Sequence, residues 1–384
     1  MRRDWTVRIA SGVSSLAQDD WSAWYADEAE GWPYYRACEA TGRMPMPVAA
    51  VEIRDAEGML VAAPLFETRY SLDTPLQGSV AAFFAKAPKR VRSLTEWPML
   101  VVGSTLTDRC HLAMRPSLPV DVQAQAIAGL IGAVEAEAKG RGAKLIAFKD
   151  LAGHERDAAR GVLRQKGYTE VVSLPCAMLE IAFSTVDEYL ASLSSSTRKD
   201  IRRKLRRARD VVIEHREDIE DIAEEIEALY AETRDRSQVR YGDFEGLPEG
   251  YFRGVARELK GSARFVLYRI DGVLAAFNLL FFEPGRVIDK FIGMRYPLAR
   301  DYDLYVVSWM ENIRICLARG ARYLQTGQTA YREKLRFGSV LRSSSNFVRA
   351  RNPMFNAFIG FAAPWIDFTR WDPDLRKLAE HKAA

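Results

Sequence analysis

Cysteine and histidine are both scarce in this 384-residue sequence, and the few that occur are scattered. The four cysteines show no CxxC pair and stand far apart, at Cys38, Cys110, Cys176 and Cys316. Zinc fingers and disulfide frameworks need closely spaced cysteines, so neither is expected and no metal site is predicted. The four histidines share no local motif with a serine or cysteine nucleophile, which disfavours a covalent hydrolase mechanism.

Long apolar runs are also absent. No stretch approaches the ~18 consecutive apolar residues of a membrane span, and the N-terminal residues turn polar before the apolar core of a signal peptide. The most apolar segment, 355–368, is interrupted by Pro364 and is interpreted as a packing segment. Lys plus Arg number 55 against 51 Asp plus Glu, so charge of one sign must come from local clustering. We expect a cytoplasmic protein of two domains.

The most informative stretch is 320–338, GARYLQTGQTAYREKLRFG. A helical pattern over 304–317 ends at Gly320, and a short strand over 322–325 follows. After the loop 326–328, Thr329 is predicted to cap a second helix that carries Tyr331 and Lys334. Polar groups at the C-terminal end of a strand are typical of the sites of α/β proteins.

The two halves of the chain share one pattern, in which a hairpin is followed by a helix, a glycine and a strand. EIRDAEGMLVAAPLF (52–66) corresponds to LYRIDGVLAAFNLLF (267–281), and EAKGRGAKLIAFKDL (137–151) to CLARGARYLQTGQTA (316–330). The fold class predicted is therefore α/β with mixed sheets, in two copies of one domain. The first copy is expected at 1–183, the second at 184–350, and a packing segment at 351–384.

A basic helix is predicted over 198–209, where eight of the twelve residues are Lys or Arg. Arg198, Arg202 and Arg206 fall within one sector of that helix. One interpretation is a surface that binds phosphate groups. The other is a solvated face whose charge is balanced by the acidic residues of 217–227.

Three segments together resemble the GNAT-fold acyltransferases. They are SSSTRKDIRRKLRRAR (194–209), the hairpin 264–282 and TGQTAYREKLRFG (326–338). The chain is most similar to the branch that holds the Fem peptidoglycan-bridge aminoacyltransferases and the CelD-like acetyltransferases. The resemblance implies two tandem GNAT domains, and transfer of an acyl or aminoacyl group to an amine from acyl-CoA or charged tRNA. It also implies a donor site in 184–350, with 1–183 shaping the acceptor pocket beside Trp32 and the loop 70–97.

One segment departs from the family pattern. Acetyl-CoA enzymes of this fold carry a glycine-rich pyrophosphate loop before the helix that here begins near 304, whereas residues 295–303 contain no glycine. Amides at the helix start can still meet a phosphate. The predicted donor-binding residues are Arg198, Arg202, Arg206, Arg300, Tyr302 and Gln328.

Three residues are predicted to be catalytic. Lys334 can stabilise the oxyanion of a tetrahedral intermediate, and Tyr331 can protonate the leaving group. Asp289, on the strand where GNAT enzymes often hold their base, can deprotonate the amine. The alternatives are that Tyr331 packs in the core with Lys334 in solvent, and that Asp289 pairs with Lys290 or an arginine.

The main hypothesis is an N-acyltransferase that moves an acyl group from acyl-CoA to a small-molecule amine by direct attack in a ternary complex. The first alternative is a Fem-type aminoacyltransferase that uses aminoacyl-tRNA. The second is a catalytically idle GNAT-like scaffold that binds a nucleic acid or an acidic protein. The acyl group, the acceptor and the oligomeric state are left open by these motifs.

Overall fold

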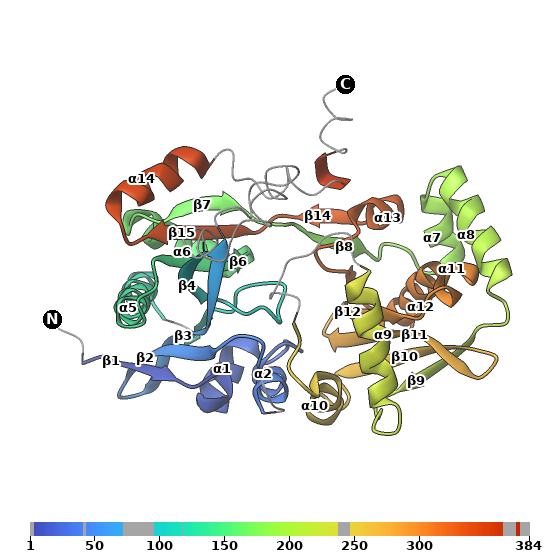
Figure 1. Cartoon of the computed structure of the whole chain (residues 1–384), viewed down its shortest axis with the longest axis horizontal. Helices are drawn as coiled ribbons and strands as arrows, with labels where there is room; N and C mark the ends of the chain where they lie inside the picture. The colour runs from blue at the N-terminus through green and yellow to red at the C-terminus, as the bar shows by residue number, and fades with distance from the viewer. Residues whose placement is uncertain are drawn as a thin grey trace. The chain divides into compact units, whose positions relative to one another are not determined.

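A computed structural model describes residues 4–40, 44–71, 96–116, 118–236, 246–363 and 374–376. The chain divides into two compact units (Figure 1). Unit 1 takes its described residues from Met1–Ala26, Met44–Pro175 and Ser343–Ala384, and unit 2 from Asp27–Arg43 and Cys176–Arg342. The predicted mixed α/β architecture, with two similar domains, is confirmed.

Unit 1 is one sheet with helices packed on it. Its strands are β1 (Thr6–Ala10), β2 (Val48–Asp55), β3 (Gly58–Ser71), β4 (Glu96–Val102), β5 (Ala113–Met114), β6 (Leu145–Leu151), β7 (Thr169–Val172) and β15 (Ser345–Ala350). Its helices are the 3-10 turn η1 (Val13–Ser15), α1 (Gln18–Tyr25), α5 (Val120–Gly140), α6 (Gly153–Gln165) and α14 (Pro353–Ala362). The strand order is β1-β2-β3-β4-β6-β15-β7, with β5 on β3, and β4 and β6 run parallel.

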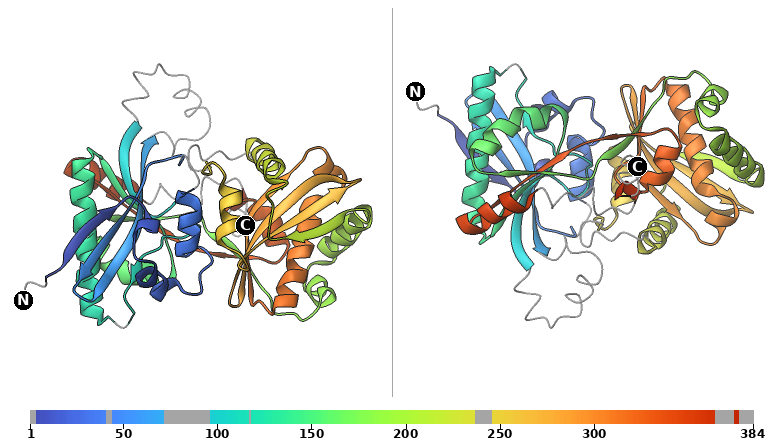
Figure 2. Two further views of the ribbon diagram at one scale, coloured as in Figure 1. Left: turned by 90° about the horizontal axis from the view of Figure 1, so that it is seen from below. Right: turned by 90° about the horizontal axis from the view of Figure 1, so that it is seen from above.

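Unit 2 repeats this plan with the order β9-β10-β11-β12-β13-β8-β14, in which β12 and β13 run parallel. Its strands are β8 (Cys176–Glu180), β9 (Val212–Arg216), β10 (Ala263–Ile270), β11 (Val273–Glu283), β12 (Arg286–Met294), β13 (Tyr323–Gln325) and β14 (Val340–Arg342). Its helices are α2 (Trp32–Glu39), α7 (Val186–Ser192), α8 (Ser195–Arg207), α9 (Ala223–Asp235), α10 (Tyr251–Glu258), α11 (Leu298–Asp301), α12 (Leu304–Arg319) and α13 (Tyr331–Arg336). Helices cover both faces of the sheet, α9 and α10 on one and α12 with α8 on the other (Figure 2).

The two sheets exchange one strand each. β8 follows β7 along the chain but pairs between β13 and β14, whereas β15 follows β14 and pairs between β6 and β7. The units therefore separate at Pro175 and Cys176 rather than at the expected 183/184, and the chain returns to unit 1 at Ser343. Residues 27–40, with Trp32, lie in unit 2, and residues 72–95 of the expected loop fall outside the described residues.

Local sequence signals account for several boundaries in unit 2. Thr185 Oγ1 accepts the amide hydrogen of Glu188 at 3.1 Å, and the Glu188 carboxylate accepts that of Ser184, one residue before the N-cap, at 2.7 Å, which is a variant of the capping box at the start of α7. Asp271 and Gly272, at φ of 50° and 80°, make the tight turn between β10 and β11. Gly320, at φ 62°, ends α12 as predicted.

Candidate active site

The candidate site lies where β12 parts from β13 in unit 2. The two strands pair over three residues only, ending at Ile288 opposite Gln325, while β12 continues to Met294. On the other side of β12, Leu279 lies opposite Phe291 but Leu280 lies opposite Asp289, so Lys290 is the extra residue of a β-bulge. Bulges of this kind re-aim side chains and are frequent next to active sites.

Asp289 is partly buried at this bulge and is held by two amides. Asn278 Nδ2 on β11 donates to Asp289 Oδ1 at 2.8 Å, and Asn312 Nδ2 on α12 donates to Oδ2 at 3.0 Å. Burial raises the pKa of Asp289 to about 6, although the charge of Lys334 and the two hydrogen bonds act to lower it. A carboxylate with this pKa can accept a proton near neutral pH.

Lys334 and Tyr331 lie on α13, and the charge of Lys334 acts on this carboxylate. Lys334 is only 6% exposed, and its Nζ donates to the backbone carbonyl of Thr326 in the loop after β13. The loop is also held on β8, because Thr326 N donates to Ala177 O and Ala177 N donates to Gly327 O, both at 2.9 Å. Tyr331 is fully buried, as the packing alternative expected, but Lys334 is buried with it instead of standing in solvent.

One alternative and one expectation at this site are wrong. Lys290 does not pair with Asp289, because its ammonium group bonds to the carboxylate of Glu30 in a pair that is almost fully buried. Thr329 does not cap α13, since the N-cap residue is Ala330, at φ 52°, with no side-chain hydrogen bond to the helix. Gln328 lies half-buried in the same loop, between β13 and α13.

Some of the basic side chains of α8 bond to other groups of unit 2. Arg198 Nη1 donates to the carbonyls of Leu190, Ala191 and Leu193 at 3.3–3.4 Å, at the C-terminal end of α7. Arg202 is 53% exposed and comes only within 3.9 Å of Asp187. Arg206 is exposed and makes no ion pair within the described part of the chain.

Two contacts join α8 to the elements around the site. Asp200 accepts hydrogen bonds from Arg336 on α13 and from Arg203 of its own helix. Burial opposes the charge of Asp200, but these bonds and one from Lys204 hold its pKa well below the usual range. Arg207 Nη2 donates to Asp301 O at 2.9 Å, which ties the end of α8 to α11.

The segment 295–303 does not form a pyrophosphate cradle. Its amides at 299–303 all donate to carbonyls of the same segment, at Arg295, Pro297, Leu298 and Arg300. Asp301 and Asp303 add negative charge beside the start of α12, and Arg207 lies 3.3 Å from the Asp303 carboxylate. Arg300 is exposed with its guanidinium 5.7 Å from the Tyr296 ring centre, and Tyr302 is half-buried. The residues present therefore do not fit the diphosphate of CoA in the usual way.

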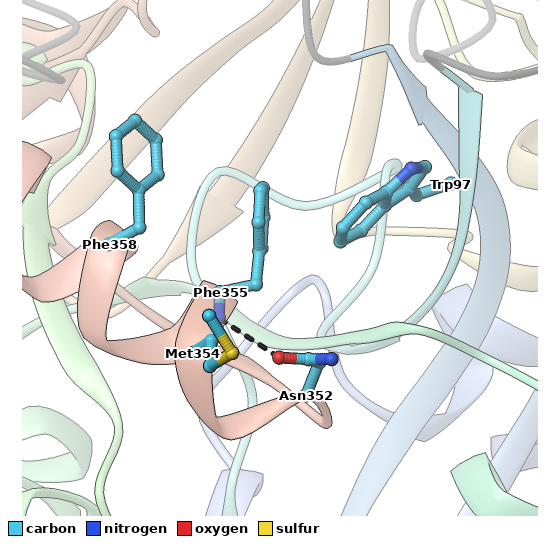
Figure 3. A pocket seen from close by; sticks show the side chains of 5 residues that line it. All are labelled: Trp97, Asn352, Met354, Phe355 and Phe358. Carbon is cyan, nitrogen blue, oxygen red and sulfur yellow. Dashed lines mark hydrogen bonds between the residues drawn. The ribbon is translucent and has the colours of Figure 1, made fainter.

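A shallow hollow of about 330 Å³ lies in unit 1, lined by Trp97, Asn352, Met354, Phe355 and Phe358 (Figure 3). The rings of Trp97 and Phe355 are 4.2 Å apart, and Asn352 caps α14 by accepting the amide hydrogen of Phe355. The hollow contains none of the predicted site residues. Among the described residues, no cluster of His, Cys, Asp and Glu could hold a metal ion, and no helix is long and apolar enough to cross a bilayer.

Comparisons with known proteins agree with this fold. Residues 195–335, from α8 into α13, match the family model of the acetyltransferase (GNAT) domain. The solved structure of FemX is 14% identical, with a TM-score of 0.52 over 91% of this chain and 96% of that one. The C-terminal domain of a protein assigned as a lysylphosphatidylglycerol synthetase from Agrobacterium fabrum is also 14% identical, with a TM-score of 0.52 over 92% and 96%. No curated protein matches the sequence.

Residues 195–335 match the GNAT domain, and in unit 2 the strands β12 and β13 separate after a short pairing, next to a β-bulge. These observations define a GNAT domain in unit 2. Because unit 1 repeats its strand order, the chain has the tandem GNAT fold of the Fem-like acyltransferases, and the resemblance inferred from the sequence is confirmed.

Sequence reasoning missed the two asparagines that bind Asp289 and the Glu30–Lys290 pair. A signal existed for Asn278, which is the only amide in the apolar strand VLAAFNLLFFE. No comparable signal marked Asn312 or Glu30, because polar residues are common in helices and loops.

Proposed function

We propose that unit 2 catalyses the transfer of an acyl group to an amine by direct attack in a ternary complex. The match to the acetyltransferase domain supports acyl transfer. One observation carries the assignment to this site. Asp289 lies where β12 separates from β13, burial raises its pKa to about 6, and the positive charge of the buried Lys334 favours its ionised form.

In the proposed reaction, the amine nitrogen forms a bond to the acyl carbon and gives a proton to Asp289. Negative charge gathers on the former carbonyl oxygen, where the Lys334 ammonium group stabilises it. The bond from the acyl carbon to the sulfur or oxygen of the carrier then breaks, and Tyr331 protonates the leaving atom. Because Tyr331 is fully buried, only a leaving group that reaches α13 can take its proton.

The first donor to consider is acyl-CoA, with the predicted donor residues of α8, α11 and the loop at Gln328 around it. Aminoacyl-tRNA is the second, and the segment 295–303 favours it, because the reactive end of a charged tRNA carries no diphosphate that must be cradled. The exposed Arg202 and Arg206 are available to phosphates. In either case the acceptor is proposed to be a small-molecule amine and the reaction to be cytoplasmic.

The proposal is tested by offering the purified protein acetyl-CoA, longer acyl-CoA thioesters and a mixture of charged tRNAs, each with a panel of amines. Release of free thiol reports transfer from CoA, and loss of the acid-precipitable aminoacyl label reports transfer from tRNA. We expect consumption of one donor class that depends on the amine. Consumption of neither, together with salt-sensitive binding of uncharged tRNA, would instead favour the scaffold.

A further inference from the structure

Two buried asparagines form a clamp around the carboxylate of Asp289. Asn278 lies in the middle of β11 and Asn312 on α12, and both are completely inaccessible to solvent. Each donates from Nδ2 to a different oxygen of Asp289, at 2.8 and 3.0 Å. The carboxylate is therefore held from the sheet and from the helix at once, which leaves its plane no freedom to rotate without breaking a bond.

This arrangement is unfavourable for folding alone. The Oδ1 atoms of both asparagines are buried without a hydrogen-bond partner among the described residues. Unsatisfied buried carbonyls destabilise a fold, and apolar side chains at these two positions would avoid the loss. The hydroxyl group of Tyr268, on the neighbouring strand β10, is buried in the same unsatisfied way. A polar cluster that costs stability in an apolar core indicates a role in the site.

We propose that Asn278 and Asn312 are positioning residues, which fix the carboxylate of Asp289 in one orientation and stabilise its charged form for proton transfer. The inference rests on the proposed function, in which Asp289 accepts the proton of the attacking amine. The two amides are not catalytic residues themselves, because they act through Asp289.

Several titratable groups face Asp289 besides the clamp. Lys334 approaches from α13, Tyr305 and Cys316 from α12, and Tyr268 from β10. The positive charge of Lys334 and the two amides favour the charged form of the Asp289 carboxylate, whereas burial disfavours that form. Removing one amide leaves every formal charge in place, so a change in the pKa of Asp289 would report the loss of that amide and not a change in a neighbouring charge.

The test is a carbon-13 NMR titration of the aspartate carboxyl carbons, with the Asp289 signal identified by its loss in Asp289→Asn. We expect Asn278→Leu and Asn312→Leu each to raise the pKa of Asp289 by roughly one unit. The acid limb of the pH profile of kcat/KM should move by the same amount, with KM for the donor unchanged. Ser308→Ala is the matched control, because Ser308 is buried on α12 one turn before Asn312, and among the described residues its hydroxyl group bonds only to Tyr305 O of its own helix.

A pKa that moves no further in the leucine variants than in Ser308→Ala overturns the proposal. If a leucine variant fails to fold, the wild type still tests the proposal. The side-chain NH₂ signals of Asn278 and Asn312 should titrate with the same midpoint as the Asp289 carboxyl carbon. NH₂ signals that do not shift at that midpoint would also overturn the proposal. Because both NMR readouts need no substrate, a protein without transferase activity would refute the proposed function while leaving the clamp measurable.

Discussion

At the residue scale, the burial of Asp289 makes the stability of unit 2 depend on pH. Its pKa is raised from 3.8 to about 6, so the folded state binds a proton more readily than the unfolded chain. The favourable contribution of the neutral acid is present below about pH 4 and is lost as the pH rises through 6. When the pH is raised from 4.5 to 7.5, the free energy of unfolding of Asp289→Asn should therefore increase by about 1–2 kcal/mol relative to that of the wild type. Urea unfolding at both pH values measures this, and a difference independent of pH would contradict it.

Lys334 offers a prediction that separates chemistry from packing. Lys334→Met keeps most of the buried side-chain volume but removes the ammonium group, so we expect turnover to fall by roughly 100-fold or more. The free energy of unfolding should change by no more than about 2 kcal/mol. Arg332→Met is the control, because Arg332 is exposed on the same helix α13 and also loses one positive charge. Parallel losses of turnover and stability in Lys334→Met would argue for a structural lysine.

Residue types alone could point to Asp289 and Lys334, but not to their surroundings. The sequence predicts Asp289 on a strand and Tyr331 and Lys334 on one helix, and in the structure they lie on β12 and α13. The partner of Asp289 could not be predicted, because the bulge at Lys290 shifts the register and turns Lys290 toward Glu30, 260 residues away. The cap at Thr329 failed because Ala330 takes up a left-handed conformation that a sequence pattern does not reveal.

At the element scale, the arginines of α8 divide into two kinds with separable effects. Arg198 donates to three carbonyls at the end of α7, so Arg198→Ala should lower the free energy of unfolding by about 1 kcal/mol. Arg206 is exposed, so Arg206→Ala should leave stability unchanged within about 0.5 kcal/mol.

The same pair of variants tests the phosphate-binding interpretation of α8. If the exposed face binds tRNA, Arg206→Ala should reduce the slope of log affinity against log salt by about one, whereas Arg198→Ala should change it less. Fluorescence titrations with labelled tRNA between low and moderate salt give the slope. Equal slopes for the wild type and Arg206→Ala would indicate that this face is only solvated.

Elements with local signals were predictable, and elements that depend on distant partners were not. The turn at Asp271–Gly272 and the capping box at Thr185 are determined by a few neighbouring residues. β8 and β15 are short strands whose position is set by hydrogen bonds to strands far away in sequence. Their exchange explains why the predicted boundary at 183/184 differs from the division at Pro175 and Cys176.

At the scale of the whole molecule, each unit depends on a strand that the other half of the chain supplies. In unit 1, β15 pairs with β6 through Phe347 opposite Phe148 and with β7 through Asn346 opposite Val171. Asn346 also accepts the amide hydrogen of Asp150 at 2.8 Å and donates to Ser173 Oγ, which joins three segments of the sheet. Without β15, β6 and β7 lose their shared partner and expose unpaired backbone groups.

A truncation after Arg342 should therefore open unit 1 at the edge formed by β6 and β7 while leaving unit 2 intact, because β8, β13 and β14 remain. Hydrogen exchange followed by mass spectrometry should show β7 exchanging at least about tenfold faster, because a loss of about 1.4 kcal/mol in local opening free energy gives that factor. The exchange rate of β12 should be unchanged. A truncation after residue 363 keeps β15 and α14 and is the matched control. If β7 stays protected in the shorter chain, the exchanged strand is dispensable for unit 1. If β12 loses protection instead, the two units depend on each other through more than the exchanged strands.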